Sequence, residues 1–131
     1  MNPILIVASL AAAGFITGCS GGASQPSSHT TSTAASIGGV QRVTLHATDG
    51  LRFTPDVISV HPGKVRVTLV DDGSYPHNFS IASLQVTSAT VSGNPGDTST
   101  TTILNLTKPG TYQFVCTFHA SAGMRGEIVV T

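Results

Sequence analysis

Short runs of alternating apolar and polar residues fill residues 40–131 of the chain. Between residues 65 and 69 every second side chain is apolar, and the same period of two places Tyr112, Phe114 and Cys116 on one face. Turn sequences separate the runs: Asp49-Gly50, His61-Pro62-Gly63, Asp72-Gly73, Asn94-Pro95-Gly96 and Lys108-Pro109-Gly110. No stretch has the period of a substantial helix. The pattern predicts an all-β Greek-key sandwich of about seven to eight strands.

Two residues with metal-binding side chains share the phase of the predicted core. His77 lies in phase with Phe79 and Ile81, and Cys116 lies in phase with Phe114. A histidine and a cysteine that both face the core side near strand ends are an uncommon pairing. The pattern therefore indicates a chemical role for this part of the sandwich.

Residues 1–18 have the character of a signal peptide. An apolar run over residues 4–16 is too short to span a bilayer comfortably, and it ends in Ile16-Thr17-Gly18-Cys19. This ending resembles the lipobox of bacterial lipoproteins, which implies acylation of Cys19 and an extracytoplasmic protein held at the cell membrane by a lipid. An ordinary signal peptide or an uncleaved anchor is the alternative. No Lys or Arg precedes the run, and a start codon further upstream is one hypothesis for this.

Residues 19–39 are expected to form a flexible linker behind the lipidated Cys19. Residues 20–39 are built almost entirely of Ser, Thr, Gly, Ala, Pro and Gln, without charge or apolar periodicity. Such a segment buries too little apolar surface to offset the entropy lost on ordering. His29 is then a solvated linker residue, and the folded domain comprises residues 40–131.

The charge balance narrows the range of partners. The 131 residues include six Lys and Arg against six Asp and Glu, which gives a formal net charge of zero. A nucleic-acid-binding protein needs a basic surface for the phosphates, so nucleic acid is excluded as a partner. The length suits one domain, and we expect a monomer.

The side chains that carry chemistry are His77, Cys116, His119 and Met124, the last three spaced as Cys-x2-His-x4-Met. Two imidazoles, one thiolate and one thioether are the ligands of a mononuclear type 1 copper site, with a trigonal His2Cys plane and a weak axial Met. The spacing therefore predicts one bound copper ion. Taken singly, a buried Cys is usually a small hydrophobe and a Met is usually core filler. A Cys19–Cys116 disulfide is a further alternative.

The same region resembles the cupredoxins, and plastocyanin-like domains most closely. The segments that carry the resemblance are Leu51-x-Phe53-x-Pro55, Tyr75-Pro76-His77-Asn78 and Tyr112-x-Phe114-x-Cys116-x2-His119-x4-Met124-x-Gly126. The resemblance implies that both histidines bind copper through Nδ1 and that the Nε2 edge of His119 lies near the surface. It also implies that Asn78 ties the His77 segment to the ligand loop by hydrogen bonds.

Three departures from plastocyanin-like domains bear on the partners. Phe118 stands where the family commonly has Pro, Val115 stands where plant plastocyanins have a Tyr, and Asp71-Asp72 is the only acidic pair. A photosynthetic partner surface is therefore not supported. We expect docking through an apolar patch around His119, formed by Tyr75, Phe118, Ala120 and Ala122.

These features favour a membrane-anchored type 1 blue-copper electron carrier over two other functions. It would cycle between Cu(I) and Cu(II) in transient contact with a redox donor and a redox acceptor. The second candidate is an extracytoplasmic copper-binding or copper-delivery protein in copper homeostasis. A small oxidase or reductase is the third, and the single predicted metal site without an open coordination position argues against it. We therefore expect that the protein is not an enzyme.

Overall fold

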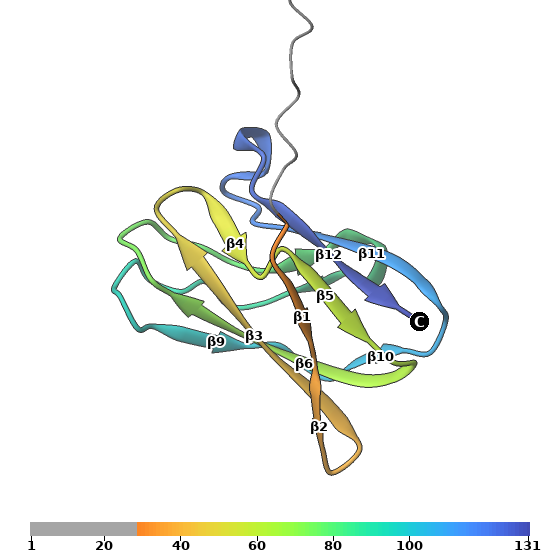
Figure 1. The fold of residues 1–131 in the computed structure, drawn as a ribbon. Helices are drawn as coiled ribbons and strands as arrows, with labels where there is room; N and C mark the ends of the chain where they lie inside the picture. Colours follow the sequence, from red (N-terminus) through yellow and green to blue (C-terminus); the bar gives the residue numbers. More distant parts are fainter. Residues whose placement is uncertain (1–28) are drawn as a thin grey trace, which may run out of the picture.

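The computed structural model describes residues 29–131. The predicted signal peptide and the predicted lipidation site, Cys19, lie outside the described residues. Residues 29–131 fold into a sandwich of two mixed β-sheets (Figure 1). The all-β sandwich expected from the sequence is confirmed.

The first sheet carries the strands that lead into and out of the ligand loop. Its strand order is β1-β5-β12-β11-β7-β8, in which β12 pairs antiparallel with β11 and parallel with β5. The bounds are β1 Thr31–Thr33, β5 Val57–Val60, β7 Ser80–Ile81, β8 Val86–Thr87, β11 Gly110–Val115 and β12 Arg125–Val130. The loop between β11 and β12 therefore begins and ends on adjacent strands.

The second sheet is built around the two longest strands, which run parallel to each other. Its order is β10-β6-β3-β2, with β4 paired to β3 and β9 paired to β6. The bounds are β2 Ala35–Ile37, β3 Val40–Thr48, β4 Arg52–Thr54, β6 Gly63–Asp71, β9 Thr98–Thr100 and β10 Leu104–Leu106. Both β3 and β6 end beside the loop that leads to His77.

The core lies between the sheets and follows the predicted alternation. In β6, Val65, Val67 and Leu69 are buried while the residues between them are partly exposed. Phe114 of β11 packs its ring against Phe53 and Phe79, with centroid separations of 5.2 and 5.0 Å. Burial of large apolar side chains from both sheets is the main force that holds such a sandwich together.

The C-terminal part of the predicted linker belongs to the fold, contrary to expectation. β1 pairs parallel with β5, and β2 pairs antiparallel with β3. Every residue of both strands is exposed, so neither strand shows the alternation on which the sequence prediction relied. These strands, with other pieces of two or three residues, raise the number of strands in residues 29–131 to twelve against the expected seven to eight.

Helical structure in residues 29–131 is limited to two 3₁₀ turns, η1 Ala82–Leu84 and η2 Ala120–Ala122. The second turn lies within the ligand loop and is followed by Gly123 in the left-handed conformation, with φ of 89°. In this part of the chain, no helix reaches the length and hydrophobicity that crossing a bilayer requires.

Candidate metal centre

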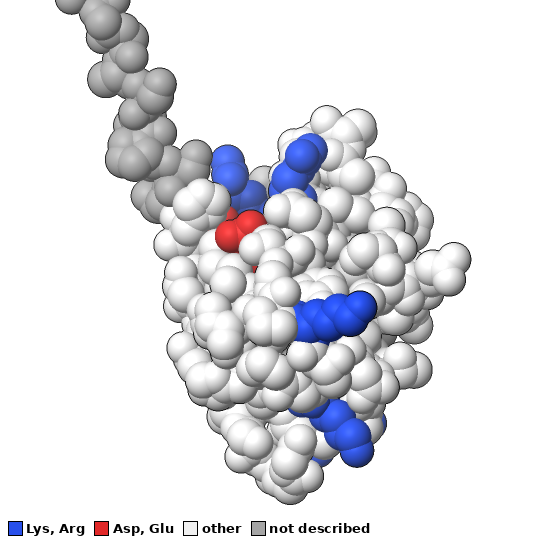
Figure 2. All heavy atoms as spheres, turned by 90° about the vertical axis from the view of Figure 1, so that its right-hand side faces the viewer, with Lys and Arg blue, Asp and Glu red and all other residues white. Residues whose placement is uncertain are grey.

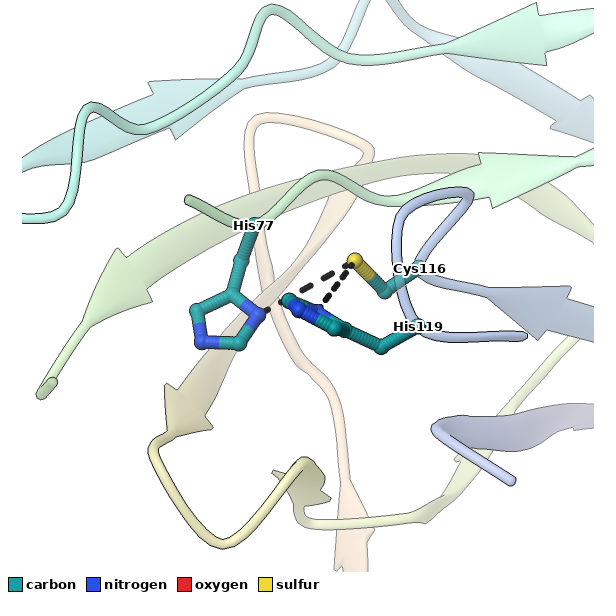
Figure 3. Close-up of side chains that lie close together, drawn as sticks. All are labelled: His77, Cys116 and His119. Carbon is teal, nitrogen blue, oxygen red and sulfur yellow. Dashed lines mark hydrogen bonds between the residues drawn. The ribbon is translucent and has the colours of Figure 1, made fainter. Parts of the chain in front are cut away.

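Two separate segments supply the predicted ligands. His77 lies between β6 and β7, while Cys116, His119 and Met124 lie on the loop from β11 to β12. Figure 3 shows the imidazoles of His77 and His119 approaching the Cys116 sulfur from different sides. The fold thus brings together residues that are 39 positions apart in the sequence.

The distances between the three donor atoms fit a single metal ion. The Cys116 Sγ atom lies 3.9 Å from His77 Nδ1 and 3.6 Å from His119 Nδ1. All three donor atoms lie within 4.8 Å of one another. Metal–nitrogen bonds of about 2.0–2.1 Å and a metal–sulfur bond of about 2.3 Å, meeting at about 120°, would separate nitrogen from sulfur by about 3.8 Å. The arrangement is therefore that of a trigonal plane with room for one ion at its centre.

Backbone hydrogen bonds close the ligand loop around this plane. The Cys116 amide donates to the Met124 carbonyl at 3.1 Å, and the Met124 amide donates to the His119 carbonyl at 3.2 Å. The His119 amide donates to the Cys116 carbonyl at 3.1 Å. The Met124 side chain is fully buried. These bonds hold the three loop residues at fixed positions relative to one another.

His77 is held on the interior side of the site. Its side chain is fully buried, and its carbonyl accepts a 2.9 Å hydrogen bond from the Val91 amide. Burial lowers the pKa of His77 below its usual 6.5, and the negative charge of Asp71 partly opposes this shift. A neutral imidazole is the form that binds a metal ion, so burial favours the ligating state.

Asn78 connects the His77 segment to the ligand loop. Its Nδ2 group donates to Thr117 Oγ1 at 2.8 Å, and its Oδ1 atom accepts a 2.8 Å hydrogen bond from the Thr117 amide. Thr117 directly follows Cys116, so this pair of bonds couples the position of His77 to that of the cysteine. Thr117 as the partner was not predicted from the sequence.

Comparison with known proteins decides the family. A family model of the cupredoxin-like domain matches residues 10–130. Plastocyanin from Daucus carota is 33% identical over 96 residues, which are 68% of this chain and 98% of that protein. The chain belongs to the cupredoxin family. Its cofactor is accordingly one copper ion in a type 1 site, and the residues that the structure brings together fit that ion.

Solved structures of low sequence identity share the cupredoxin fold. Auracyanin A from Chloroflexus aurantiacus has a TM-score of 0.57 and 17% identity, over 71% of this chain and 100% of that chain. The metal-binding domain of the Cu(I)-exporting P-type ATPase CopA from Streptococcus pneumoniae has a TM-score of 0.61 and 13% identity, over 77% of this chain and 95% of that chain. At these identities the likeness concerns the fold alone.

The outer side of this cupredoxin site is aromatic and exposed. His119 is half-buried, and its ring centroid lies 6.3 Å from that of Tyr75 and 6.4 Å from that of Phe118. Tyr75 and Phe118 are 52% and 51% exposed, which is high for large apolar side chains. Ala120 and Ala122 belong to η2 on the same loop, the first half-buried and the second exposed.

One buried charge near the cupredoxin site was not assigned a role from the sequence. Asp71 ends β6 and is fully buried, and its Oδ1 atom accepts a 2.9 Å hydrogen bond from the Gly73 amide. Its Oδ2 atom and the Nε2 atom of His77 are both buried without a hydrogen-bond partner among the described residues. The alternation along β6 was the available signal, because it places Asp71 on the face of Leu69.

The path of the chain after the ligand loop also depends on Gly126, the second residue of β12. A Cβ atom there would overlap both the Phe114 ring and the Asp56 carbonyl oxygen. Glycine therefore allows β12 to approach the core directly after Met124. Within residues 29–131, Cys116 is a free and buried thiol, and Cys19 lies outside that range.

Proposed function

We propose that the protein is a type 1 blue-copper electron carrier, held outside the cytoplasmic membrane by a lipid on Cys19. The observation that supports this best is the triangle of His77 Nδ1, Cys116 Sγ and His119 Nδ1, whose edges suit one ion. The ion would supply one-electron chemistry by cycling between Cu(I) and Cu(II). The protein would transfer electrons from a redox donor to a redox acceptor.

We assign the ligand roles from the donor atoms and their burial. His77 Nδ1, His119 Nδ1 and Cys116 Sγ would hold the ion, and the Met124 thioether would be a fourth, weaker ligand. Cys116, His77 and Met124 are fully buried, so the protein excludes water from most of the coordination sphere. A closed, rigid site changes little between the two oxidation states, which favours rapid electron exchange.

The half-buried ring of His119 offers the route to a partner. Tyr75 and Phe118 flank this ring and present exposed apolar surface, and Ala120 and Ala122 extend it along η2. A partner that contacts this patch comes close to His119 without any large conformational change. Brief redox contacts need only a small interface, so we propose transient docking here by a monomeric carrier.

The same buried ligands argue against the two other functions. A copper-delivery protein needs ligands that a partner can reach and exchange, whereas three of the four side chains here are fully buried. An enzyme needs an open coordination position for its substrate, and four protein ligands would leave none. We therefore propose that the protein carries electrons and transforms no substrate.

The visible spectrum of the copper-loaded chain tests this proposal. We expect an intense blue thiolate-to-copper charge-transfer band that disappears in Cys116→Ser, because the band arises from the bond between this sulfur and Cu(II). His61→Gln serves as a matched control, since His61 is an exposed histidine outside the triangle. A colourless wild-type protein that binds copper, or one that readily gives copper to an apoprotein, would instead favour copper delivery.

Intact-mass analysis of the membrane-bound form tests acylation of Cys19.

A further inference from the structure

The first described residues begin at the copper end of the sandwich. β1 runs parallel to β5 with Thr31 opposite Val57, and Val57 in turn lies opposite Glu127 of β12. β12 starts directly after Met124, so the beginning of β1 lies next to the ligand loop (Figure 1). The N-terminal segment therefore enters the fold beside the metal centre.

Several hydrogen bonds fix this entry point. The carboxylate of Asp56 binds His29 Nδ1 at 2.8 Å and accepts a 2.7 Å hydrogen bond from the Thr30 amide. The Val57 amide donates to the Thr30 carbonyl at 3.2 Å, and further along β1 the Ala34 amide donates to the Ser59 carbonyl at 3.2 Å. We refer to residues 29–37 as the strap.

Because of the strap, the chain enters the domain at the end opposite to the start of β3. β3 begins at Val40, which pairs with Lys64 at the start of β6, and it ends near Asp71 and the His77 loop. A linker joined directly to Val40, as expected from the sequence, would enter at the opposite end. β3 has nine residues, which at about 3.3 Å per residue correspond to roughly 30 Å. The strap returns the chain over this distance to the copper end.

The chain between Cys19 and the strap is short. Residues 20–28 can span at most about 35 Å even when fully extended. Attached at the copper end, a chain of this length keeps the ligand loop close to the surface that holds Cys19. Attached at the far end, the same chain would allow the ligand loop to point away from that surface.

Side chains of both charge signs surround the entry point. Arg52 and Arg125 are exposed and line a small cavity together with Thr30, Gly123 and Asp56. The two arginines are opposed by the Asp56 carboxylate, which is hydrogen-bonded to His29 and to the Thr30 amide, and by Glu127 in the adjoining cavity. Near the top of Figure 2, basic side chains lie on either side of an acidic one at this end of the domain. With the charges balanced, the orientation depends on the point of attachment rather than on attraction to lipid headgroups.

We propose that the strap orients the domain with its copper end toward the membrane, so that its partner is a redox protein whose electron-accepting or electron-donating centre lies at that membrane surface. This inference rests on the proposed lipid anchor at Cys19. It goes further, because a carrier anchored through Val40 without the strap would be free to point its ligand loop away from the membrane. The membrane-facing side then includes the His119 patch and the arginines beside the strap.

Paramagnetic broadening by a membrane tests the orientation. The copper-loaded chain beginning at Cys19 is attached to vesicles that contain a nitroxide-headgroup lipid. Its own acyl chains provide the attachment. If its mass shows a free Cys19, a maleimide lipid in the vesicle is used instead. Cys116 is buried and does not compete for the maleimide. In the diamagnetic Cu(I) form, we expect the amide NMR signals of Ser121 and Gly123 to lose several-fold more intensity than those of Gly38 and Gly39, in the turn between β2 and β3. Equal loss at both ends, or greater loss at Gly38 and Gly39, would overturn the proposal.

A pair of matched variants separates the strap from other causes of orientation. Asp56→Ala removes both side-chain contacts that hold His29 and Thr30, and we expect it to reduce the difference between the two ends. Asp72→Ala removes another exposed Asp–His pair, with His46 at 2.8 Å, and should leave the difference unchanged. If Asp56→Ala behaves like wild type, the strap does not orient the domain. Because mass reports acylation and blue colour reports the copper site, failure of the proposed function would be recognised separately.

Discussion

His77 and His119 both direct an Nδ1 atom toward the Cys116 sulfur, yet they belong to different environments. His77 is fully buried and is held by Val91 on the interior side. His119 is half-buried, and it lies between two exposed aromatic rings on a loop of the outer surface. The interior histidine has little freedom to move, whereas the outer one is accessible to another molecule. The comparison indicates that the interior side, with His77, fixes the geometry of the site, while the exterior side, with His119, is available for contact with a partner.

Removing each histidine in turn should give the largest effect and test this comparison directly. We expect both His77→Gly and His119→Gly to lose the blue colour of the Cu(II) protein, because each removes one ligand of the trigonal plane. Added imidazole should restore the colour in His119→Gly, since the space left by that ring opens toward solvent. It should not restore the colour in His77→Gly, where the space would be enclosed. Visible titrations with imidazole measure both outcomes.

Equal rescue of the two variants would show that the interior and exterior sides are alike in access, contrary to the structure. Thermal unfolding of each variant is a necessary control, because a glycine at the buried position also leaves a cavity. Rescue is therefore compared only under conditions in which both variants are folded.

The hydrogen bonds between Asn78 and Thr117 link the two sides, and their removal should have the next largest effect. We expect Asn78→Ala to lower the free energy of unfolding by about 1–3 kcal/mol, because the Thr117 amide loses its partner in a part-buried position. Chemical denaturation of the copper-free protein measures this change. Asn105→Ala, at an exposed position of β10, is the control and should cost far less. If both variants lowered the free energy of unfolding equally, the hydrogen bonds between Asn78 and Thr117 would not be a source of stability.

The buried charge of Asp71 distinguishes the interior side electrostatically. Among the charged groups around His77, Asp71 has the strongest effect, and a nearby negative charge stabilises Cu(II) relative to Cu(I). We expect Asp71→Asn to raise the reduction potential; a tenfold change in the relative binding of the two ions corresponds to about 59 mV, and we expect a rise of that order. The exposed neighbour provides the control, since Asp72→Asn should shift the potential less. A potential that stays the same or falls in Asp71→Asn would exclude this role.

The sequence predicted those parts of the molecule in which burial follows a regular pattern. β6 alternates between buried and partly exposed residues along its length, and the spacing from Cys116 to Met124 was sufficient to propose the ligand loop. Asp71 shows the limit of this reasoning. It occupies the next buried position after Leu69, but in the sequence Asp71-Asp72 is recognisable only as an acidic pair.

The strap could not be predicted for a related reason. β1 and β2 are exposed along their whole length, so their Ser, Thr and Ala residues resemble those of a flexible linker. Their stability depends on backbone pairing with β5 and β3 and on the carboxylate of Asp56, which are contacts with distant parts of the chain. Local composition carries no information about such partners. Thr117 was missed in the same way, because only the fold brings it to Asn78.

Acid titration of the copper-free protein should give the smallest effect, because it concerns a single imidazole on the interior side. Burial lowers the pKa of His77 below 6.5, so between that lowered value and about 6.5 the unfolded chain binds a proton at His77 that the folded protein does not. The free energy of unfolding should therefore decrease as the pH falls below about 6.5. Chemical denaturation at several pH values measures this slope. The slope should be smaller in His77→Gln, which removes this imidazole. If His77→Gln keeps the wild-type slope, then burial does not hold His77 neutral, and the interior and exterior histidines would differ only in their exposure and contacts.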